Sequence, residues 1–293
     1  MALFAPGINA RVMAKAFAAG ADAVILDLED TVPVAAKSEA RSLVAAAIDG
    51  QVAATAAPGP SIYVRTNAAS TVHLDDDIAA AVRPGLDAVV LPKAESVAEV
   101  QRAAALIARR ETERSIPAGS VALILQIESA LGVYRCFDLV KASPRVGATC
   151  IGSGRDGDLQ ADLGCSWSSE GVELLYARSK VLLDTRAAGS HVVPLDGVYT
   201  DLADEAGLIR DSRLSARLGY VGRTAIHPRQ IAPMRQAYAL SSTELDGYRR
   251  IIAEFEAAEK RGTASIAVDG RLVDYAMYQR ARSVLDLAKL DQR

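Results

Sequence analysis

The feature that most constrains this fold is a recurrence of short apolar runs separated by longer, alanine-rich stretches. The runs fall at residues 3–6, 23–28, 62–65, 88–92, 121–127, 148–152, 191–199 and 223–226. Most of them are continuously apolar rather than alternating, which is typical of strands that are buried on both faces of a parallel sheet. Eight strand–helix units predict an α/β protein with a TIM-type (β/α)8 barrel, a fold that typically spans about 250 residues.

Helix signals lie between the apolar runs, as this fold requires. Ser96 and Glu99 form a capping-box pattern ahead of an amphipathic stretch that reaches about Arg110. Residues 172–188 repeat apolar side chains at helical spacing. We expect surface loops at residues 53–60 and 109–119.

An extension follows the predicted barrel, so we divide the chain into a catalytic barrel domain at 1–240 and a C-terminal lid at 241–293. A second capping box at Ser241 and Glu244 opens a helix that ends by Gly262. A hairpin at 265–273 with an Asp269-Gly270 turn follows, and then a last helix at 276–290. An extension this small has little core of its own, so we expect the barrel or a neighbouring subunit to cover its apolar face. We therefore expect an oligomer.

Charge and cysteine content exclude several classes of function. With 33 Lys and Arg against 36 Asp and Glu, the net charge is −3, so the chain lacks the basic field that attracts nucleic acid. Its apolar runs are far shorter than the roughly 20 residues of a membrane-spanning helix. The N-terminus lacks the pattern of a secretory signal, and the three cysteines are too few for a disulfide framework. We expect a cytoplasmic protein without a membrane or nucleic-acid partner.

Polar residues gather where the predicted strands end, which is where barrels of this kind build their active sites. In chain order they are Asp27, Glu29, Asp30, Arg65, Lys93, Glu95, Glu128, Asp156, Asp158 and His227. Each one alone could be a solvated loop charge. Together on one rim of a barrel, they predict a catalytic site.

Glu128 directly follows a strongly apolar run, where an unpaired carboxylate carries a high desolvation cost. Its partner is either an Arg or Lys side chain, or a bound metal ion with Asp158 as the second ligand. Two carboxylates together with substrate oxygens and water favour Mg²⁺ over zinc. Arg65 and Lys93 would then place positive charge opposite the metal, suited to a substrate carboxylate and an enolate oxygen.

Three other features have competing interpretations. Residues 152–157 match G-x-G-x-x-G, but the acidic residues Asp158 and Asp162 that follow would repel a pyrophosphate, so we favour a metal-holding loop. His227 is either a base or a structural hydrogen-bonding residue. The cysteines at 136, 150 and 165 are expected to be small buried hydrophobes rather than nucleophiles.

Nine ordered motifs resemble the HpcH/HpaI aldolase and citrate lyase family, in particular the citrate lyase beta subunit and its stand-alone acyl-CoA lyase relatives. The resemblance covers essentially the whole chain. The motifs are Leu3–Gly7, Gly20–Asp30 with Lys37 and Arg41, Val64–Arg65, Leu91–Glu95, Ile127–Glu128, Asp158–Gly164, Asp196–Asp201, Ala225–Pro228 and Asp269–Asp274.

This resemblance implies a Mg²⁺-dependent carbon–carbon lyase, often trimeric, that cleaves a 3-hydroxyacyl thioester into an oxo-acid and a thioester enolate. Glu128 and Asp158 match the metal ligands of the family, and Arg65 matches the residue that binds the oxyanion or carboxylate. Asp274 matches an aspartate that reaches into a neighbouring subunit as catalytic acid or base. We also expect Lys93 to be catalytic, and Glu29, Asp30 and Gly7 to bind substrate with Arg65.

Two departures from the family pattern leave details open. Asn9 stands where many relatives have an arginine, although Arg11 lies nearby, and this affects the expected thioester or phosphate contacts. The loop 152–158 is longer than usual between glycine and ligand, so Asp156 is an alternative to Asp158.

Four alternative functions remain at this stage. The same site could hydrolyse the thioester or run a malate-synthase-like condensation. Lys93 could instead form a Schiff base in a metal-free aldolase. The chain could also be a non-catalytic subunit that binds an acyl carrier. The sequence leaves open the acyl group, which could be citryl, malyl, citramalyl or methylmalyl, and the carrier, which could be CoA or acyl carrier protein.

Overall fold

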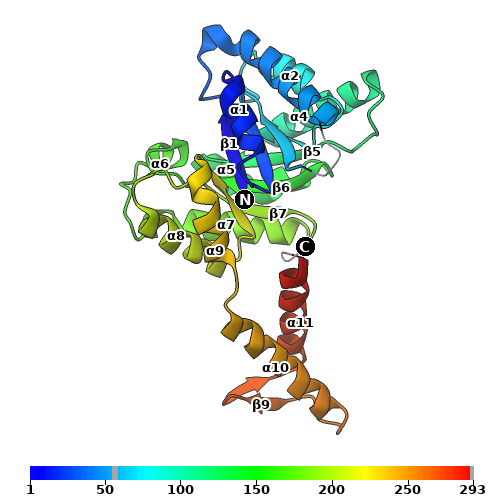
Figure 1. The fold of residues 1–293 in the computed structure, drawn as a ribbon, viewed down its shortest axis with the longest axis vertical. Helices are drawn as coiled ribbons and strands as arrows, with labels where there is room; N and C mark the ends of the chain where they lie inside the picture. Colours follow the sequence, from blue (N-terminus) through cyan, green and yellow to red (C-terminus); the bar gives the residue numbers. More distant parts are fainter. Residues whose placement is uncertain (55–58, 291–293) are drawn as a thin grey trace. The chain divides into compact units, whose positions relative to one another are not determined.

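A computed structural model describes residues 1–54 and 59–290 of the chain. Within it, parallel strands close into a barrel in chain order, which confirms the predicted TIM-type fold (Figure 1). The strands are β1 (Ala2–Pro6), β2 (Ala23–Asp27), β3 (Ser61–Arg65), β4 (Ala88–Leu91), β5 (Ala122–Ile127), β6 (Val146–Ile151), β7 (Val193–Asp196) and β8 (Gly222–Ala225). Each predicted run overlaps one strand; β1, β3, β6 and β8 begin one or two residues earlier than predicted, and β7 is shorter than the run 191–199.

Helices connect successive strands. They are α1 (Ala10–Phe17), α2 (Lys37–Ala54), α3 (Leu74–Ala81), α4 (Val97–Glu113), α5 (Ala130–Lys141), α6 (Asp158–Leu163), α7 (Val172–Ala188), α8 (Glu205–Leu218) and α9 (Ile231–Tyr238), with short 3₁₀ turns η1 (Val34–Ala36) and η2 (Pro228–Gln230). The capping box at Ser96 is formed. The loop predicted at 109–119 begins later, because α4 continues to Glu113, where Arg109 forms an i,i+4 ion pair with Glu113. Residues 55–58 of the other predicted loop lie outside the described residues.

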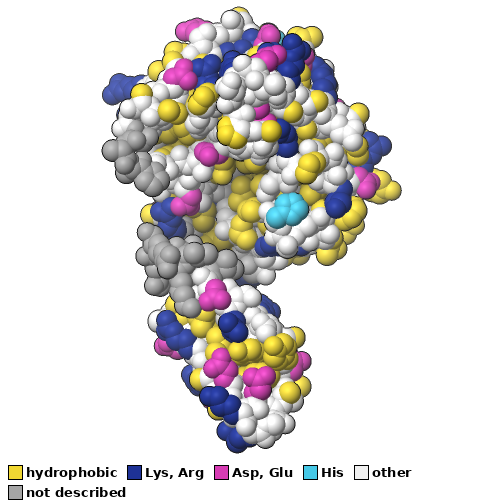
Figure 2. Space-filling view, turned by 90° about the vertical axis from the view of Figure 1, so that its right-hand side faces the viewer, with side chains coloured by type: hydrophobic (Ala, Val, Ile, Leu, Met, Phe, Trp, Pro, Cys, Tyr) yellow, Lys and Arg dark blue, Asp and Glu magenta, His cyan; other side chains and the backbone are white. Residues whose placement is uncertain are grey.

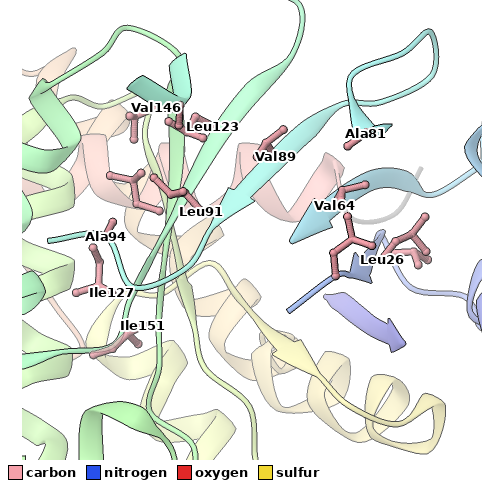
Figure 3. Packing of buried hydrophobic residues seen from close by; sticks show 14 of the residues in the cluster. Leu26, Val64, Ala81, Val89, Leu91, Ala94, Leu123, Ile127, Val146 and Ile151 are labelled. Carbon is pink, nitrogen blue, oxygen red and sulfur yellow. The ribbon is translucent and has the colours of Figure 1, made fainter. Parts of the chain in front are cut away.

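Alternate residues of each strand face two different apolar layers. Leu26, Val64, Leu91 and Ile151 belong to the larger cluster, which also contains residues of the surrounding helices (Figure 3). The intervening residues form a second cluster inside the barrel, made of Ala2, Ala23, Ile25, Ala88, Val90, Ile124, Ala148 and Cys150. The strands are therefore apolar on both faces, and this explains why the runs read as continuous rather than alternating.

The chain divides into two compact units, Met1–Tyr238 and Ala239–Arg293. The second unit contains α10 (Ser242–Glu259), an antiparallel hairpin of β9 (Ile266–Val268) and β10 (Arg271–Val273), and α11 (Tyr275–Leu290). Its small core includes Phe255, which stacks on Tyr278 with ring centroids 4.8 Å apart. Leu272, Tyr275 and Met277 are exposed, and Figure 2 shows apolar side chains on the surface of this unit. In the described part of the chain, no helix is long and apolar enough to cross a membrane.

Candidate active site

Because side chains alternate between the two faces of a strand, polar residues at the strand ends point into one end of the barrel. Asp27 follows Ala23 and Ile25 at spacings of two, and Gln126 follows Ile124 in the same way, so both share the inward face of their strands. Asp27 of β2 is paired in register with Arg65 of β3. Because neighbouring residues in a parallel sheet point to the same side, these two opposite charges meet at the carboxyl ends of their strands.

Asp27 and Arg65 form a buried bidentate ion pair. The Nε and Nη2 atoms of Arg65 donate to the two carboxylate oxygens of Asp27 at 2.7 and 2.8 Å. Burial favours the neutral carboxyl, but the hydrogen bonds and charge of Arg65 outweigh it, so the pKa of Asp27 is lowered. The guanidinium also lies over the ring of Phe4, 4.9 Å from its centroid. These contacts hold Arg65 in a fixed orientation.

Glu29 and Lys93 extend this charged layer. Lys93 Nζ donates to Glu29 Oε1 at 2.9 Å and lies 3.3 Å from Asp158 Oδ2, while Glu29 Oε2 lies 3.2 Å from Arg65 Nη1. Burial raises the pKa of Glu29 to about 7 in spite of the two cations. Burial lowers the pKa of Lys93, but the hydrogen bond and charge of Glu29 raise this pKa by a larger amount. The pKa therefore lies above its ordinary value, and the amine stays protonated.

Glu128 is held by neutral donors. The side-chain amide of Gln126 donates to its Oε2, and the backbone N–H of Lys93 donates to its Oε1 at 2.9 Å. Lys93 has a φ of 50°, an uncommon conformation for a non-glycine residue that turns this N–H toward the carboxylate. Gly152 allows the close approach of the next strand, since a Cβ there would lie 2.5 Å from the Cβ of Glu128. Gly152 therefore packs against Glu128.

The carboxylate of Glu128 has the character of a cation ligand. It is 5% exposed, and burial raises its pKa. Among the described residues it forms no ion pair with Arg, Lys or His, so neither Arg65 nor Lys93 is its direct partner. The charge of Asp158 also raises the pKa of Glu128, which places the two carboxylates within electrostatic reach of each other. A buried carboxylate that neighbours a second one is stabilised by a shared cation.

Glu128 and Asp158 line a cavity of about 220 Å³ at the carboxyl ends of the strands. The cavity is also lined by Arg65, Asp30 and Arg155. Asp156 lies outside this lining and its side chain is 78% exposed, so the geometry favours Asp158 over Asp156 as the second ligand.

The charges around the cavity fit a divalent cation. Asp27, Glu29, Asp30 and Asp158 each form an ion pair with Arg65 or Lys93, and the charge of Lys37 also acts on three of these carboxylates. Glu128 is the carboxylate of this group that has no ion pair with a described side chain. Gln126 Oε1 is a buried acceptor that lacks a hydrogen-bond partner in the described structure. No group of three or more His, Cys, Asp or Glu suited to a metal occurs in the ranges 1–54 and 59–290. Magnesium commonly uses one or two carboxylates and takes its remaining ligands from water and substrate, so the donor set fits Mg²⁺.

The other predicted residues occupy varied positions. Gly7 packs against the backbone of β2, where a Cβ would lie 2.5 Å from the carbonyl oxygen of Asp27, and it lies outside the cavity lining. Glu29 and Lys93 also lie outside the lining, where Glu29 is paired with Arg65 and Lys93 with Asp158. Asn9 caps α1 by accepting from the N–H of Val12. Asp274 belongs to the second unit, where it is exposed and accepts from the backbone N–H of Met277.

His227 and the cysteines have structural surroundings. His227 Nδ1 accepts a hydrogen bond from the backbone N–H of Arg229, which favours its structural interpretation. Burial raises the pKa of the thiols of Cys136 and Cys150 to about 12, so they are poor nucleophiles.

Several functional contacts were missed in the sequence. Gln126 is the polar residue within the apolar run 121–127, and this interruption was the available signal. Phe4 gave no signal, because its contact with Arg65 depends on closure of the barrel. A buried network was also missed: Asp196 pairs with Arg178 and accepts from Ser153 Oγ at 3.1 Å, which ties the loop after β6 to β7.

Comparison with known proteins shows which family the chain belongs to. The profile of the HpcH/HpaI aldolase/citrate lyase family matches residues 1–228. The chain belongs to this family. This confirms the resemblance drawn from the sequence motifs.

Members of the HpcH/HpaI family match over nearly the whole chain. The chain is 36% identical to citrate lyase subunit beta of Leuconostoc mesenteroides subsp. cremoris, over 98% of this chain and 92% of the relative. It is 33% identical to the (3S)-malyl-CoA thioesterase of Cereibacter sphaeroides, over 98% and 93% of the two chains. The crystal structure of Mycobacterium tuberculosis CitE with magnesium, acetoacetate and coenzyme A is similar with a TM-score of 0.76 and 32% identity, covering 98% of this chain and 97% of that one.

Proposed function

We propose that this protein is a Mg²⁺-dependent carbon–carbon lyase that cleaves a 3-hydroxyacyl-CoA thioester into an oxo-acid and a shorter acyl-CoA. The observation that carries the proposal is the buried Glu128 carboxylate, which is held by neutral donors beside Asp158 in a cavity that Arg65 also lines. The relatives support it, since one is named as a citrate lyase subunit and a similar structure holds magnesium and coenzyme A.

Glu128 and Asp158 would hold the metal, and Arg65 would bind the substrate. A divalent cation bound there makes a coordinated hydroxyl more acidic and polarises a carbonyl oxygen. Gln126 and the N–H of Lys93 fix both oxygens of Glu128, so the ligand is pre-oriented before substrate arrives. The guanidinium of Arg65, held by Asp27, presents a fixed positive charge to the substrate carboxylate or to the oxyanion that develops.

The reaction requires two proton transfers. Removal of the hydroxyl proton lets the carbon–carbon bond break, with its electron pair passing to the thioester enolate, and protonation of that carbon then completes the acyl-CoA product. We assign acid–base transfer to Asp274 of a neighbouring subunit in a homotrimer. The exposure of Asp274 and of the apolar side chains Leu272, Tyr275 and Met277 supports this assignment. The second unit would then act as a lid between subunits.

A cleavage screen tests the proposed reaction. Purified protein is incubated with citryl-, malyl-, citramalyl- and methylmalyl-CoA, and release of the oxo-acid is measured with Mg²⁺ and with EDTA. Cleavage of at least one ester that is lost with EDTA and restored by Mg²⁺ supports the lyase. Turnover that is unaffected by EDTA would contradict it.

A thioesterase is the second candidate, because one relative is named as a malyl-CoA thioesterase. The same screen separates the two: a thioesterase releases free CoA and an intact hydroxy-acid, whereas a lyase releases an oxo-acid and acyl-CoA. The Schiff-base alternative is weaker, because the ion pairs of Lys93 with Glu29 and Asp158 keep the amine protonated and therefore non-nucleophilic. Borohydride should accordingly fail to trap an oxo-acid on Lys93.

We place the protein in the cytoplasm as part of this proposal. The three cysteines are free, and two of them are buried. Such cysteines are typical of a reducing compartment.

A further inference from the structure

The loop between β6 and α6 carries a cation that the proposed reaction does not use. Arg155 lines the same cavity as Glu128, Asp158 and Arg65. Arg65 ends β3 and Arg155 follows β6, with Glu128 after β5 between them on the ring of strands. The cavity lining therefore has a cation on each side of Glu128 along the ring of strands.

The two arginines differ in how far their charge is already neutralised. Arg65 is bonded to both oxygens of Asp27 and lies 3.2 Å from Glu29. Arg155 is 49% exposed, and its single ion pair in the described structure is with the adjacent Asp156, at 3.4 Å. None of the described residues accepts a hydrogen bond from its guanidinium. Its donors are therefore available to a ligand.

Trp167 supports this guanidinium. The Arg155 Cζ atom lies 5.0 Å from the centre of the Trp167 ring system, which packs edge-on against Tyr199. Stacking on an aromatic face restricts an arginine without using its hydrogen-bond donors. Gly154 holds the loop close to the segment after β7, since a Cβ there would lie 2.8 Å from a methyl group of Val198.

We propose that Arg155 determines specificity by binding a second carboxylate on the oxo-acid half of the substrate. This inference rests on the proposed lyase function, in which the first carboxylate is bound near Arg65 and the metal. The substrate class is then an acyl group that yields a 2-oxo diacid, rather than a 2-oxo acid with a single carboxylate. The planar guanidinium matches a carboxylate in a bidentate arrangement.

A carboxylate fits this position better than a phosphate of the carrier. Arg155 and Arg65 are the cations among the described residues that line the cavity. Asp156 and Asp158 follow Arg155 in the same loop and would repel a doubly charged phosphate more strongly than a singly charged carboxylate.

Binding of two oxo-acids tests the assignment without requiring turnover. Oxaloacetate has the second carboxylate and pyruvate lacks it. Each is mixed with the Mg²⁺-loaded full-length protein in a stopped-flow instrument, before oxaloacetate decarboxylates, and the emission of Trp167 is followed. Trp167 is the single tryptophan of the chain, so its signal reports directly on the Arg155 stack. Where an oxo-acid leaves the emission of Trp167 unchanged, its affinity is measured by its competition with a fluorescent probe that binds at the metal.

The variants are Arg155→Met, Arg155→Lys and the control Arg102→Met. Arg102 is 47% exposed and pairs with Asp75 on α3, outside the cavity lining. We expect the wild type and Arg102→Met to bind oxaloacetate at least about tenfold more tightly than pyruvate, as a charge-assisted hydrogen bond implies. Arg155→Met should lose this preference with pyruvate affinity unchanged, and Arg155→Lys should keep part of it.

Three results would overturn the inference while leaving the lyase intact: equal affinity of the wild type for the two oxo-acids, an unchanged preference in Arg155→Met, or, in a parallel titration with CoA, a loss of CoA affinity alone in Arg155→Met. If neither oxo-acid binds the Mg²⁺-loaded wild type, both the lyase and this inference fail.

Discussion

The substitution Asp27→Asn tests whether the buried ion pair organises the site. Asn has nearly the same shape as Asp, but it lacks the negative charge. One of the two carboxylate oxygens that accept from Arg65 is replaced by an amide NH₂ group, which is a donor. Asp27 is fully buried and Arg65 is 7% exposed, so the guanidinium would lose its principal counter-charge where water does not replace it. Removal of one partner of a buried pair costs about 3–5 kcal/mol. Glu29 lies 3.2 Å from Arg65 and compensates in part, so we expect about 3 kcal/mol.

The matched control is Asp22→Asn. Asp22 is paired with Arg235 at 2.6 Å and with the N-terminal ammonium of Met1, but the Asp22 and Arg235 side chains are more than half exposed, so loss of the charge should cost about 0–1 kcal/mol. Urea unfolding at pH 7, followed by the emission of Trp167 in the barrel unit, measures both free energies of unfolding. An Asp27→Asn variant no less stable than Asp22→Asn would refute the argument. The Asp27→Asn variant should also bind oxo-acids more weakly, because Arg65 loses its fixed orientation.

Three further predictions concern the metal, the pH dependence of stability and the acid–base residue. Glu128→Gln should abolish Mg²⁺ binding in calorimetry, while Asp156→Asn retains it. An equal loss of binding in both variants would make Asp156, rather than Asp158, the second ligand. Glu29 has a pKa of about 7 in the folded protein against 4.5 for the free side chain, so it stabilises the fold fully below pH 4.5 and loses that contribution as the pH rises to 7. The 2.5-unit difference is about 3 kcal/mol, and Glu29→Gln should remove that slope from the stability–pH profile; an unchanged slope would contradict the shift. Asp274→Asn keeps a residue that caps α11 equally well, so turnover should fall about 10²–10⁴-fold with unchanged thermal stability, and full activity would exclude the proposed role.

The barrel could be predicted from the sequence because its signals are local. The apolar runs are short, and a capping serine marks the start of the helix after some of them, as at Ser96 after β4 and Ser129 after β5. The strand ends also identified the rim, since polar residues such as Arg65 and Glu128 stop runs that are otherwise apolar. The loop at 109–119 was placed too early because charges at Arg109 and Glu113, which suggest a loop, instead form a pair along the last turn of α4.

The partners of these polar residues could not be predicted in the same way. The sequence pointed to Arg65 and Lys93 as charges opposite the metal, but it gave no signal that Arg65 pairs with Asp27 or that Lys93 bridges Glu29 and Asp158. Those pairings depend on strand register and on barrel closure, which join residues far apart in the chain. The role of the Lys93 backbone is similar, because its φ of 50° follows from the turn after β4 rather than from the residue type.

The sequence by itself determined that this chain folds as repeated strand–helix units and that acidic and basic residues end the strands, because periodicity, caps and composition act over a few neighbouring residues. The tertiary structure decided which of those residues meet. The register of β2 with β3 joined Asp27 and Arg65 in one ion pair, and closure of the barrel brought Arg155 and Arg65 to the same cavity. The physical reason is that a buried charge takes its energy from the groups that surround it, and only the folded chain brings those groups together.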